Sequence, residues 1–182
     1  KYLVAAIAFV LCSAHAGVIN VPSASGEPTK TFFSRADNAR GTVVVILGGE
    51  GRIGLSNDTE DVNRASFNML KPLLQAGYNL VAFDSPTELF NPRDMSAPRR
   101  GTDHQRRIGE VVKFYAQQKP VWLFGHSLGA VSVSEFANNQ DNRKYLAGLI
   151  VSGEHASTWL DKSITMPVLF LHHEHDKIGR AH

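Results

Sequence analysis

The segment GHSLG, at residues 125–129, constrains the fold of this chain more than any other feature. It follows an apolar run at residues 121–124 and precedes a helix-forming stretch at residues 130–138. A serine between two glycines at a strand-to-helix junction is the nucleophile-elbow pattern G-x-S-x-G. The flanking glycines carry no Cβ atom, so the strand and the helix can pass each other closely. The pattern therefore predicts a sharp turn that lifts the hydroxyl of Ser127 above the edge of a sheet.

Two interpretations of this segment differ in whether Ser127 has a chemical role. In an ordinary glycine-rich turn of a Rossmann-like sheet, Gly125 and Gly129 would serve packing alone. In an elbow, the serine hydroxyl becomes a nucleophile once a base takes its proton. The backbone N–H of Leu128 then points at the oxygen that gains negative charge. We favour the elbow because it requires a buried strand directly before the turn and a helix directly after it, and the sequence has both.

Strand-like and helix-like segments alternate along most of the chain. Five continuous apolar runs have the composition of strands buried on both faces; they are residues 42–47, 78–83, 121–124, 146–151 and 168–171. The alternation predicts an α/β fold, with a mostly parallel sheet and helices on both of its faces. Chemistry in such sheets gathers at the carboxyl ends of the strands. The residues that lie just past a predicted strand end are Gly48, Asp84, Ser127, Glu154 and Asp176.

Two helices are predicted between these strands. The first has apolar residues on one face over residues 62–76 and ends at Gly77, which suits the C′ position. Pro72 within it predicts a kink or a late start. The second helix begins at residues 102–105, which have the spacing of a capping box. Its buried stripe is predicted at Ile108, Val111, Val112 and Tyr115.

The composition is that of one globular domain. The 182 residues are 43% hydrophobic and 20% charged, which fits a single packed core. The net charge is +2 and no dense basic run is present, so a nucleic-acid partner has no support. A small cluster of arginines is interpreted as the solvated start of a helix; it comprises Arg99, Arg100, Arg106 and Arg107.

Residues 1–16 have the pattern of a secretory signal peptide. Lys1 precedes an apolar stretch, and Ala14 and Ala16 give the A-x-A cleavage pattern. The stretch is too short for a stable membrane-spanning helix. We therefore expect export to the periplasm or the exterior of a bacterium, with a mature chain that starts at Gly17. The alternatives are a buried first strand and, less favoured, lipid attachment at Cys12.

The rest of the chain divides into two parts. Residues 17–40 are polar and predict a leader segment with one strand at residues 31–33. Residues 41–182 are predicted to form the main α/β domain. Cleavage after Ala16 removes Cys12, the single cysteine, so we expect no disulfide in the mature chain.

The order of these segments resembles the α/β-hydrolase superfamily over residues 42–176. The segments that carry the resemblance are LGGEG after the first long strand, AGYNLVAFDSP, GHSLGA and PVLFLHHEHD. The resemblance implies a serine hydrolase with a Ser–acid–His triad and no metal or other cofactor. It implies acyl transfer to water, with a small-molecule ester as the substrate.

The family pattern assigns roles to individual residues. Ser127 matches the nucleophile, and the N–H of Leu128 matches one oxyanion-hole donor. The loop after the first long strand supplies the second donor, which the pattern places at Glu50, with Gly49 next; Gly48 stands where the family often has histidine. Asp176 matches the triad acid.

Other polar residues near the elbow have their own interpretations. Glu154 is the alternative acid, because some family members carry the acid one strand earlier. Asp84 matches a carboxylate that holds loops at the sheet edge. His126 is rejected as the base, since a residue next to the nucleophile on a strained turn points away from it.

The base histidine is expected after the acid, following one more strand. Only six residues follow Asp176, and His182 is a disfavoured candidate. We therefore expect a partial hydrolase domain that lacks the last strand, the last helix and the base histidine.

Two rival functions remain at this point. A catalytically inactive hydrolase fold could bind a ligand or a protein partner. The cluster from His172 to Asp176 holds three histidines and two carboxylates, which with His155 could coordinate a transition metal.

Overall fold

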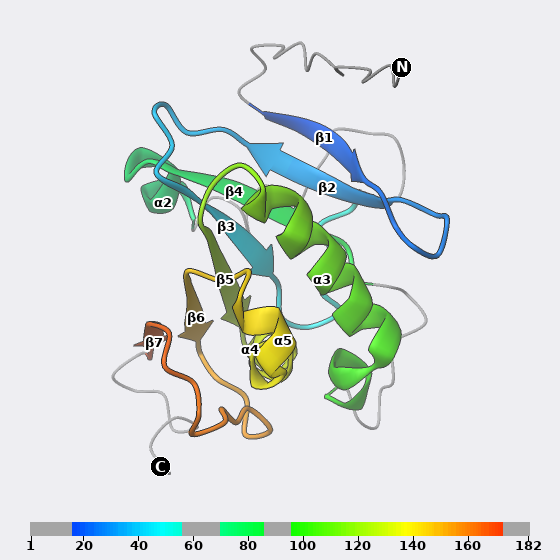
Figure 1. Cartoon of the computed structure of the whole chain (residues 1–182), viewed down its shortest axis with the longest axis vertical. Helices are drawn as coiled ribbons and strands as arrows, with labels where there is room; N and C mark the ends of the chain where they lie inside the picture. The colour runs from blue at the N-terminus through cyan, green and yellow to red at the C-terminus, as the bar shows by residue number, and fades with distance from the viewer. Residues whose placement is uncertain (1–15, 56–69, 86–95, 173–182) are drawn as a thin grey trace, which may run out of the picture.

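The computed structural model describes residues 16–55, 70–85 and 96–172. Within these ranges one seven-stranded sheet has the order β1-β2-β4-β3-β5-β6-β7 (Figure 1). Its strands are β1 (Ala16–Val21), β2 (Thr29–Ser34), β3 (Gly41–Ile46), β4 (Tyr78–Phe83), β5 (Val121–His126), β6 (Gly148–Ser152) and β7 (Val168–Leu171). The run from β4 through β3, β5 and β6 to β7 is parallel, so these strands end at one edge of the sheet. The predicted mostly parallel α/β sheet is confirmed.

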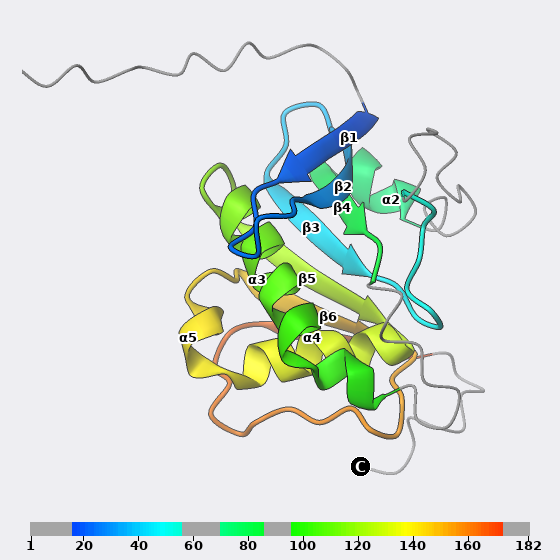
Figure 2. The ribbon, with the colours of Figure 1, turned by 90° about the vertical axis from the view of Figure 1, so that its right-hand side faces the viewer.

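Helices cover both faces of the sheet, as the alternation predicted. The helices α3 (Thr102–Ala116) and α4 (Leu128–Asn138) pack on the face that carries Val44 and Ile46. The short α2 (Lys71–Gln75) lies on the opposite face, with Val43 and Val45 (Figure 2). Alternate residues of β3 thus enter two separate apolar cores, which explains why all six residues of this strand are buried.

The helix predictions are confirmed in part. Ile108, Val111, Val112 and Tyr115 are buried on α3. Pro72 lies in the first turn of α2, where proline fits, and Gly77 follows the helix with φ +82°. Residues 62–69 of the predicted first helix lie outside the described residues.

The predicted capping box of α3 does not form. The N-cap residue is Gly101, which has no side chain that could accept a hydrogen bond from the first turn. Gln105 Nε2 instead donates to the carbonyl oxygens of Arg99 (2.7 Å) and Ser132 (3.1 Å). The amide of Gln105 is thus used to join α3 to α4, because those carbonyls need partners in the interior.

The N-terminal segment is part of the sheet, which corrects its prediction as a leader with a single strand. β1 and β2 form an antiparallel hairpin, and β2 pairs antiparallel with β4. β1 was not predicted because it is a short edge strand whose exposure alternates along its length, so it has no continuous apolar run. Tyr115 of α3 anchors the hairpin: its hydroxyl lies 2.9 Å from Thr31 Oγ1, and its ring stacks on Phe33 at 5.7 Å. Burial raises the pKa of Tyr115 to about 12.

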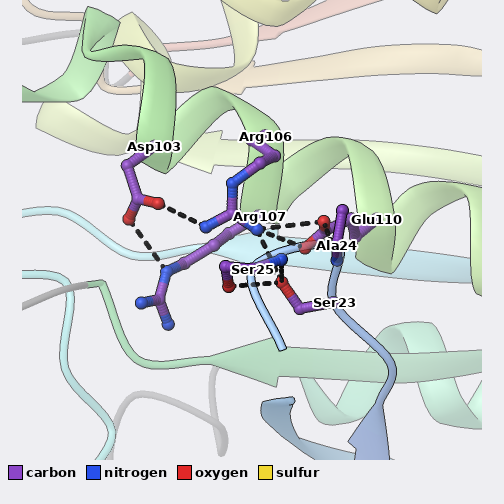
Figure 3. Close-up of polar contacts among 7 residues, drawn as sticks. All are labelled: Ser23, Ala24, Ser25, Asp103, Arg106, Arg107 and Glu110. Atoms are coloured by element: carbon purple, nitrogen blue, oxygen red, sulfur yellow. Dashed lines mark hydrogen bonds and ion pairs between the residues drawn. The ribbon is translucent and has the colours of Figure 1, made fainter. Parts of the chain in front are cut away.

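The loop between β1 and β2 is also tied to α3 (Figure 3). Glu110 Oε1 accepts a hydrogen bond from the backbone N–H of Ala24 (2.9 Å), and Arg106 donates to Ser23 Oγ (2.6 Å) and to Glu110 (2.9 Å). Asp103 accepts hydrogen bonds from both Arg106 and Arg107. These polar contacts fix the hairpin against the helix at the surface, while Tyr115 does so in the core.

Two shorter elements and one long loop complete the described fold. The 3-10 turn η2 (Ala97–Arg100) precedes α3, and α5 (Gln140–Arg143) follows α4. A long loop then joins β6 to β7. No helix in the described ranges is both long and apolar enough to cross a membrane.

Candidate active site

Ser127 lies on a strained turn between β5 and α4. Its dihedral angles are φ 52° and ψ −121°, a conformation that residues with a side chain rarely adopt. Two backbone hydrogen bonds hold it: Ser127 N–H donates to Ser152 O (2.9 Å), and Ala130 N–H donates to Ser127 O (2.8 Å). The predicted strand, sharp turn and helix are therefore present. This strained conformation places Ser127 at the carboxyl edge of the sheet, between the end of β5 and the start of α4.

The glycines on either side of the turn allow a very close crossing of backbones. A Cβ atom on Gly125 would lie 2.6 Å from Val133 Cγ2, and one on Gly129 would collide with the carbonyl oxygen of Ile46. Any larger residue at these positions would force α4 away from the sheet. The crossing thus fixes the position of Ser127 relative to β3.

Leu128 is the first residue of α4. The N–H groups of the first helical turn have no partner within the helix, and the helix dipole places positive potential at this end. An oxyanion formed next to Ser127 would therefore meet donors that are already oriented.

A glycine turn after β3 faces the serine from the neighbouring strand. A Cβ atom on Gly48 would lie 2.9 Å from Ser127 Cβ and 3.5 Å from Ser127 Oγ. The turn closes with a hydrogen bond from Gly51 N–H to Gly48 O (2.9 Å), and Gly49 has φ +57°. A side chain at position 48 would collide with Ser127, which explains why this position is occupied by glycine.

Glu50, the predicted second donor residue, occupies the third position of this turn. Its side chain is exposed and pairs with Arg52 at 3.9 Å, a contact that contributes little to stability. Its backbone N–H is the group that matters for the predicted role.

Asp84 holds the loop next to this turn. Its carboxylate accepts hydrogen bonds from the backbone N–H groups of Ile53 (2.5 Å), Gly54 (3.1 Å) and Leu55 (2.7 Å). The prediction of a structural carboxylate at the sheet edge is confirmed by these contacts.

His126 points along the sheet toward β6. Its Nδ1 lies 3.3 Å from Ser152 Oγ, and a Cβ atom on Gly153 would lie 3.1 Å from its Cε1. These contacts hold the ring against β6, in agreement with the rejection of His126 as the base.

The structure brings only some of the predicted polar residues to this edge. Glu154, the alternative acid, follows β6 by two residues and is half-buried. Asp176, the favoured acid, lies outside the described residues, as does His182.

The rival metal site is described only in part. The segment 173–176 lies outside the described residues, so the cluster as a whole is untested. His172 stacks on Phe170 with ring centroids 6.2 Å apart, and His155 Nδ1 accepts from Ser157 N–H (3.2 Å). No group of three metal-binding side chains occurs within residues 16–55, 70–85 and 96–172.

A buried polar network, which was not predicted from the sequence, lies behind the glycine turn. Arg99 is 3% exposed, so its assignment to a solvated basic patch is wrong. His104 is fully buried, and its Nε2 lies 2.9 Å from Ser132 Oγ, which also lies 3.5 Å from Arg99 Nη1. A signal for His104 was present, because it continues the buried stripe of α3 one turn before Ile108.

Burial keeps His104 neutral. Loss of hydration, and then the positive charge of Arg99, lower its pKa to about 3. The unfolded chain binds a proton at this residue below about pH 6.5, whereas the folded chain does not. His104 therefore stabilises the fold fully above about pH 6.5, and this contribution falls as the pH drops toward 3.

We expect the free energy of unfolding to fall by up to about 1.4 kcal/mol per pH unit below pH 6 through this residue. His104→Gln keeps a polar atom for Ser132 and does not titrate, so it should flatten the profile between pH 6 and 4.5. Urea unfolding across this range measures the slope. His155→Gln is the matched control, and an unchanged slope in His104→Gln would contradict the assignment.

Solved structures of several hydrolases share this architecture. A lidless α/β serine hydrolase from Xanthomonas campestris aligns with a TM-score of 0.60 and 16% identity, over 89% of this chain and 72% of that one. An α/β serine hydrolase homologue from Coxiella burnetii aligns with a TM-score of 0.59 and 16% identity, over 91% of this chain and 76% of the homologue.

This chain aligns with only about half of a larger hydrolase of the same fold. An esterase from Pyrococcus furiosus gives a TM-score of 0.55 and 13% identity, over 76% of this chain and 51% of the esterase. Comparisons with family models and with curated protein sequences give no match. At these identities the likeness concerns the fold, and this chain has the α/β-hydrolase fold.

Proposed function

We propose that this protein is a serine hydrolase that cleaves a small ester by acyl transfer to water, with Ser127 as the nucleophile. The observation that carries the proposal is the conformation of Ser127. A serine held at φ 52° directly before a helix, with a glycine turn against its hydroxyl, is costly to build, and strain of this kind is concentrated at functional sites. The structural likeness to serine hydrolases and an esterase supports the same chemistry.

The proposed reaction has two steps. Ser127 Oγ forms a bond to the ester carbonyl carbon while its proton passes to a histidine, and the carbonyl oxygen becomes an oxyanion held by the N–H groups of Leu128 and Glu50. The ester C–O bond then breaks, and the alcohol leaves with the proton from the histidine. Water attacks the acyl-serine in the second step, which releases the acid and restores Ser127.

The remaining triad members belong to the proposal. Asp176 orients the histidine and stabilises its charged form, with Glu154 as the alternative acid. The histidine follows the acid in the family's order. No metal or other cofactor takes part in this scheme.

The test is turnover of short-chain aryl esters by the full-length protein. We expect hydrolysis that stops after treatment with a fluorophosphonate, with one equivalent bound per chain. Absence of both turnover and labelling would favour the inactive, ligand-binding alternative. Hydrolysis that survives complete labelling would contradict Ser127 as the nucleophile.

We also propose that the protein is exported, with residues 1–16 removed as a signal peptide. The first described strand begins at Ala16, so cleavage after this residue would leave the β1–β2 hairpin nearly whole. We expect the mature protein purified from its native host to begin at Gly17, as read by mass spectrometry of the N-terminal peptide. A mature chain that retains residues 1–16 would contradict export by this route.

A further inference from the structure

We propose that Arg99 is a positioning residue that holds the glycine turn after β3 in the orientation that the oxyanion hole requires. This inference rests on the proposed function, since it assigns a purpose to the turn beside Ser127. It concerns a residue that lies 28 positions before the serine and that the triad chemistry does not use.

The guanidinium of Arg99 is buried and bound almost wholly to neutral oxygen atoms. Nη2 donates to Gly49 O at 2.6 Å, and Nη1 donates to Leu47 O at 3.1 Å. Longer contacts join Nη1 to Ser85 Oγ (3.4 Å) and Ser132 Oγ (3.5 Å). No carboxylate pairs with Arg99 among the described residues.

Burying a cation without a carboxylate partner costs free energy of folding, so a gain in stability does not explain why Arg99 is buried. Burial lowers the pKa of Arg99 to about 10, so the group is still charged at neutral pH. Its two shortest hydrogen bonds both go to the segment after β3, although that segment is about 50 residues away in sequence. The arginine is therefore placed to act on this turn.

Each of these bonds fixes the direction of an N–H group. A carbonyl and the N–H of the following residue belong to one planar, trans peptide unit and point in opposite directions. When Arg99 binds the carbonyl of Gly49, it sets the direction of the N–H of Glu50. Its bond to Leu47 O likewise sets the N–H of Gly48.

The peptide between Gly49 and Glu50 is the one that needs this control. The turn closes through Gly51 N–H and Gly48 O, so the central peptide takes no part in the closing bond. Turns with a positive φ at the second residue occur in two forms that differ by rotation of this central peptide. Arg99 selects one form by binding its carbonyl, and the charged donor also polarises the peptide and strengthens the N–H of Glu50 as a donor.

The contacts around the guanidinium leave little room for another arrangement. A Cβ atom on Gly51 would lie 2.8 Å from Arg99 Nη2, so the turn rests directly on the arginine. Ser85, which lies two residues after β4, donates its N–H to Gly51 O (2.8 Å) and holds the same turn. Lysine could keep the charge at this position, but it could not bind both carbonyls in the planar fork geometry of arginine.

The test compares Arg99→Lys with Arg100→Lys in the full-length protein. Arg100 is the neighbouring arginine; it donates to Ser157 O (2.6 Å) and pairs with Glu135 (3.7 Å), away from the turn. We expect Arg99→Lys to lower kcat for a short-chain aryl ester by roughly 10- to 100-fold with KM within about threefold, because the donor acts on the transition state. Arg100→Lys should leave both constants within about twofold.

Hydrogen exchange provides a readout that does not depend on activity. In Arg99→Lys the peptide over residues 47–53 should exchange at least about tenfold faster, with β5 and α4 unchanged. Arg99→Gln, which removes the charge, should show the same pattern where it folds, and circular dichroism checks this.

The outcomes separate the two proposals. An unchanged kcat, a loss confined to KM, or an equal loss in Arg100→Lys would overturn the positioning role. If the wild-type protein does not hydrolyse esters, the hydrolase proposal fails. Exchange at residues 47–53 then decides alone whether Arg99 holds the turn, and unchanged exchange would overturn that claim as well.

Discussion

Replacement of Ser127 by alanine is expected to lower kcat for ester hydrolysis by at least about 10³-fold while the fold stays intact. The nucleophile forms the covalent intermediate, and the residual rate comes only from binding and the oxyanion donors. Alanine must adopt the same positive φ as serine, so the backbone strain is unchanged and the free energy of unfolding should shift by less than about 0.5 kcal/mol. Steady-state kinetics and thermal unfolding of the full-length variant measure the two effects.

Two companion variants sharpen this result. Ser127→Gly removes the hydroxyl and also relieves the strain, so it should be equally inactive and no less stable than Ser127→Ala. Ser25→Ala, in the exposed β1–β2 loop, should behave as wild type. An active Ser127→Ala protein would remove the basis of the proposed mechanism.

Replacement of Gly129 by alanine is expected to cost about 3 kcal/mol of folding stability or more. The added Cβ would collide with the carbonyl oxygen of Ile46, which belongs to the central strand β3. Neither group can move freely, since one is in the first turn of α4 and the other is in the buried core. Urea unfolding measures the loss, and failure to obtain folded protein is the extreme form of the same result.

Gly17→Ala is the matched control for this substitution. An added Cβ at Gly17 has no atom within 4 Å, and the residue lies in the edge strand β1. Its effect should stay within about 0.5 kcal/mol. Equal stability of Gly129→Ala and Gly17→Ala would show that α4 does not cross β3 as closely as described.

The sequence was sufficient for those parts of the fold that depend on local pattern. β4 and β7 have the predicted bounds, because a continuous β-branched or apolar run has few alternatives once turn residues flank it. The turn at Ser127 was equally predictable, because the G-x-S-x-G pattern lies between a strand-like run and a helix-forming stretch. Burial of Ile108 and Tyr115 followed from helical spacing.

The remaining features depend on contacts that are distant in sequence. β1 is a short edge strand, and only its pairing with β2 defines it. Arg99 was interpreted as exposed because arginine usually is, yet carbonyls some 50 residues earlier give it buried partners. Composition near Arg99 carries no sign of that distant turn. Neighbouring Arg100 has the same local sequence context and remains half-buried.

The most direct test of the central claim is to locate the fluorophosphonate adduct on the full-length protein by mass spectrometry of its peptides. The account predicts a single adduct on Ser127, formed in wild type and absent in Ser127→Ala. An adduct on another residue, or labelling that persists in Ser127→Ala, would contradict it.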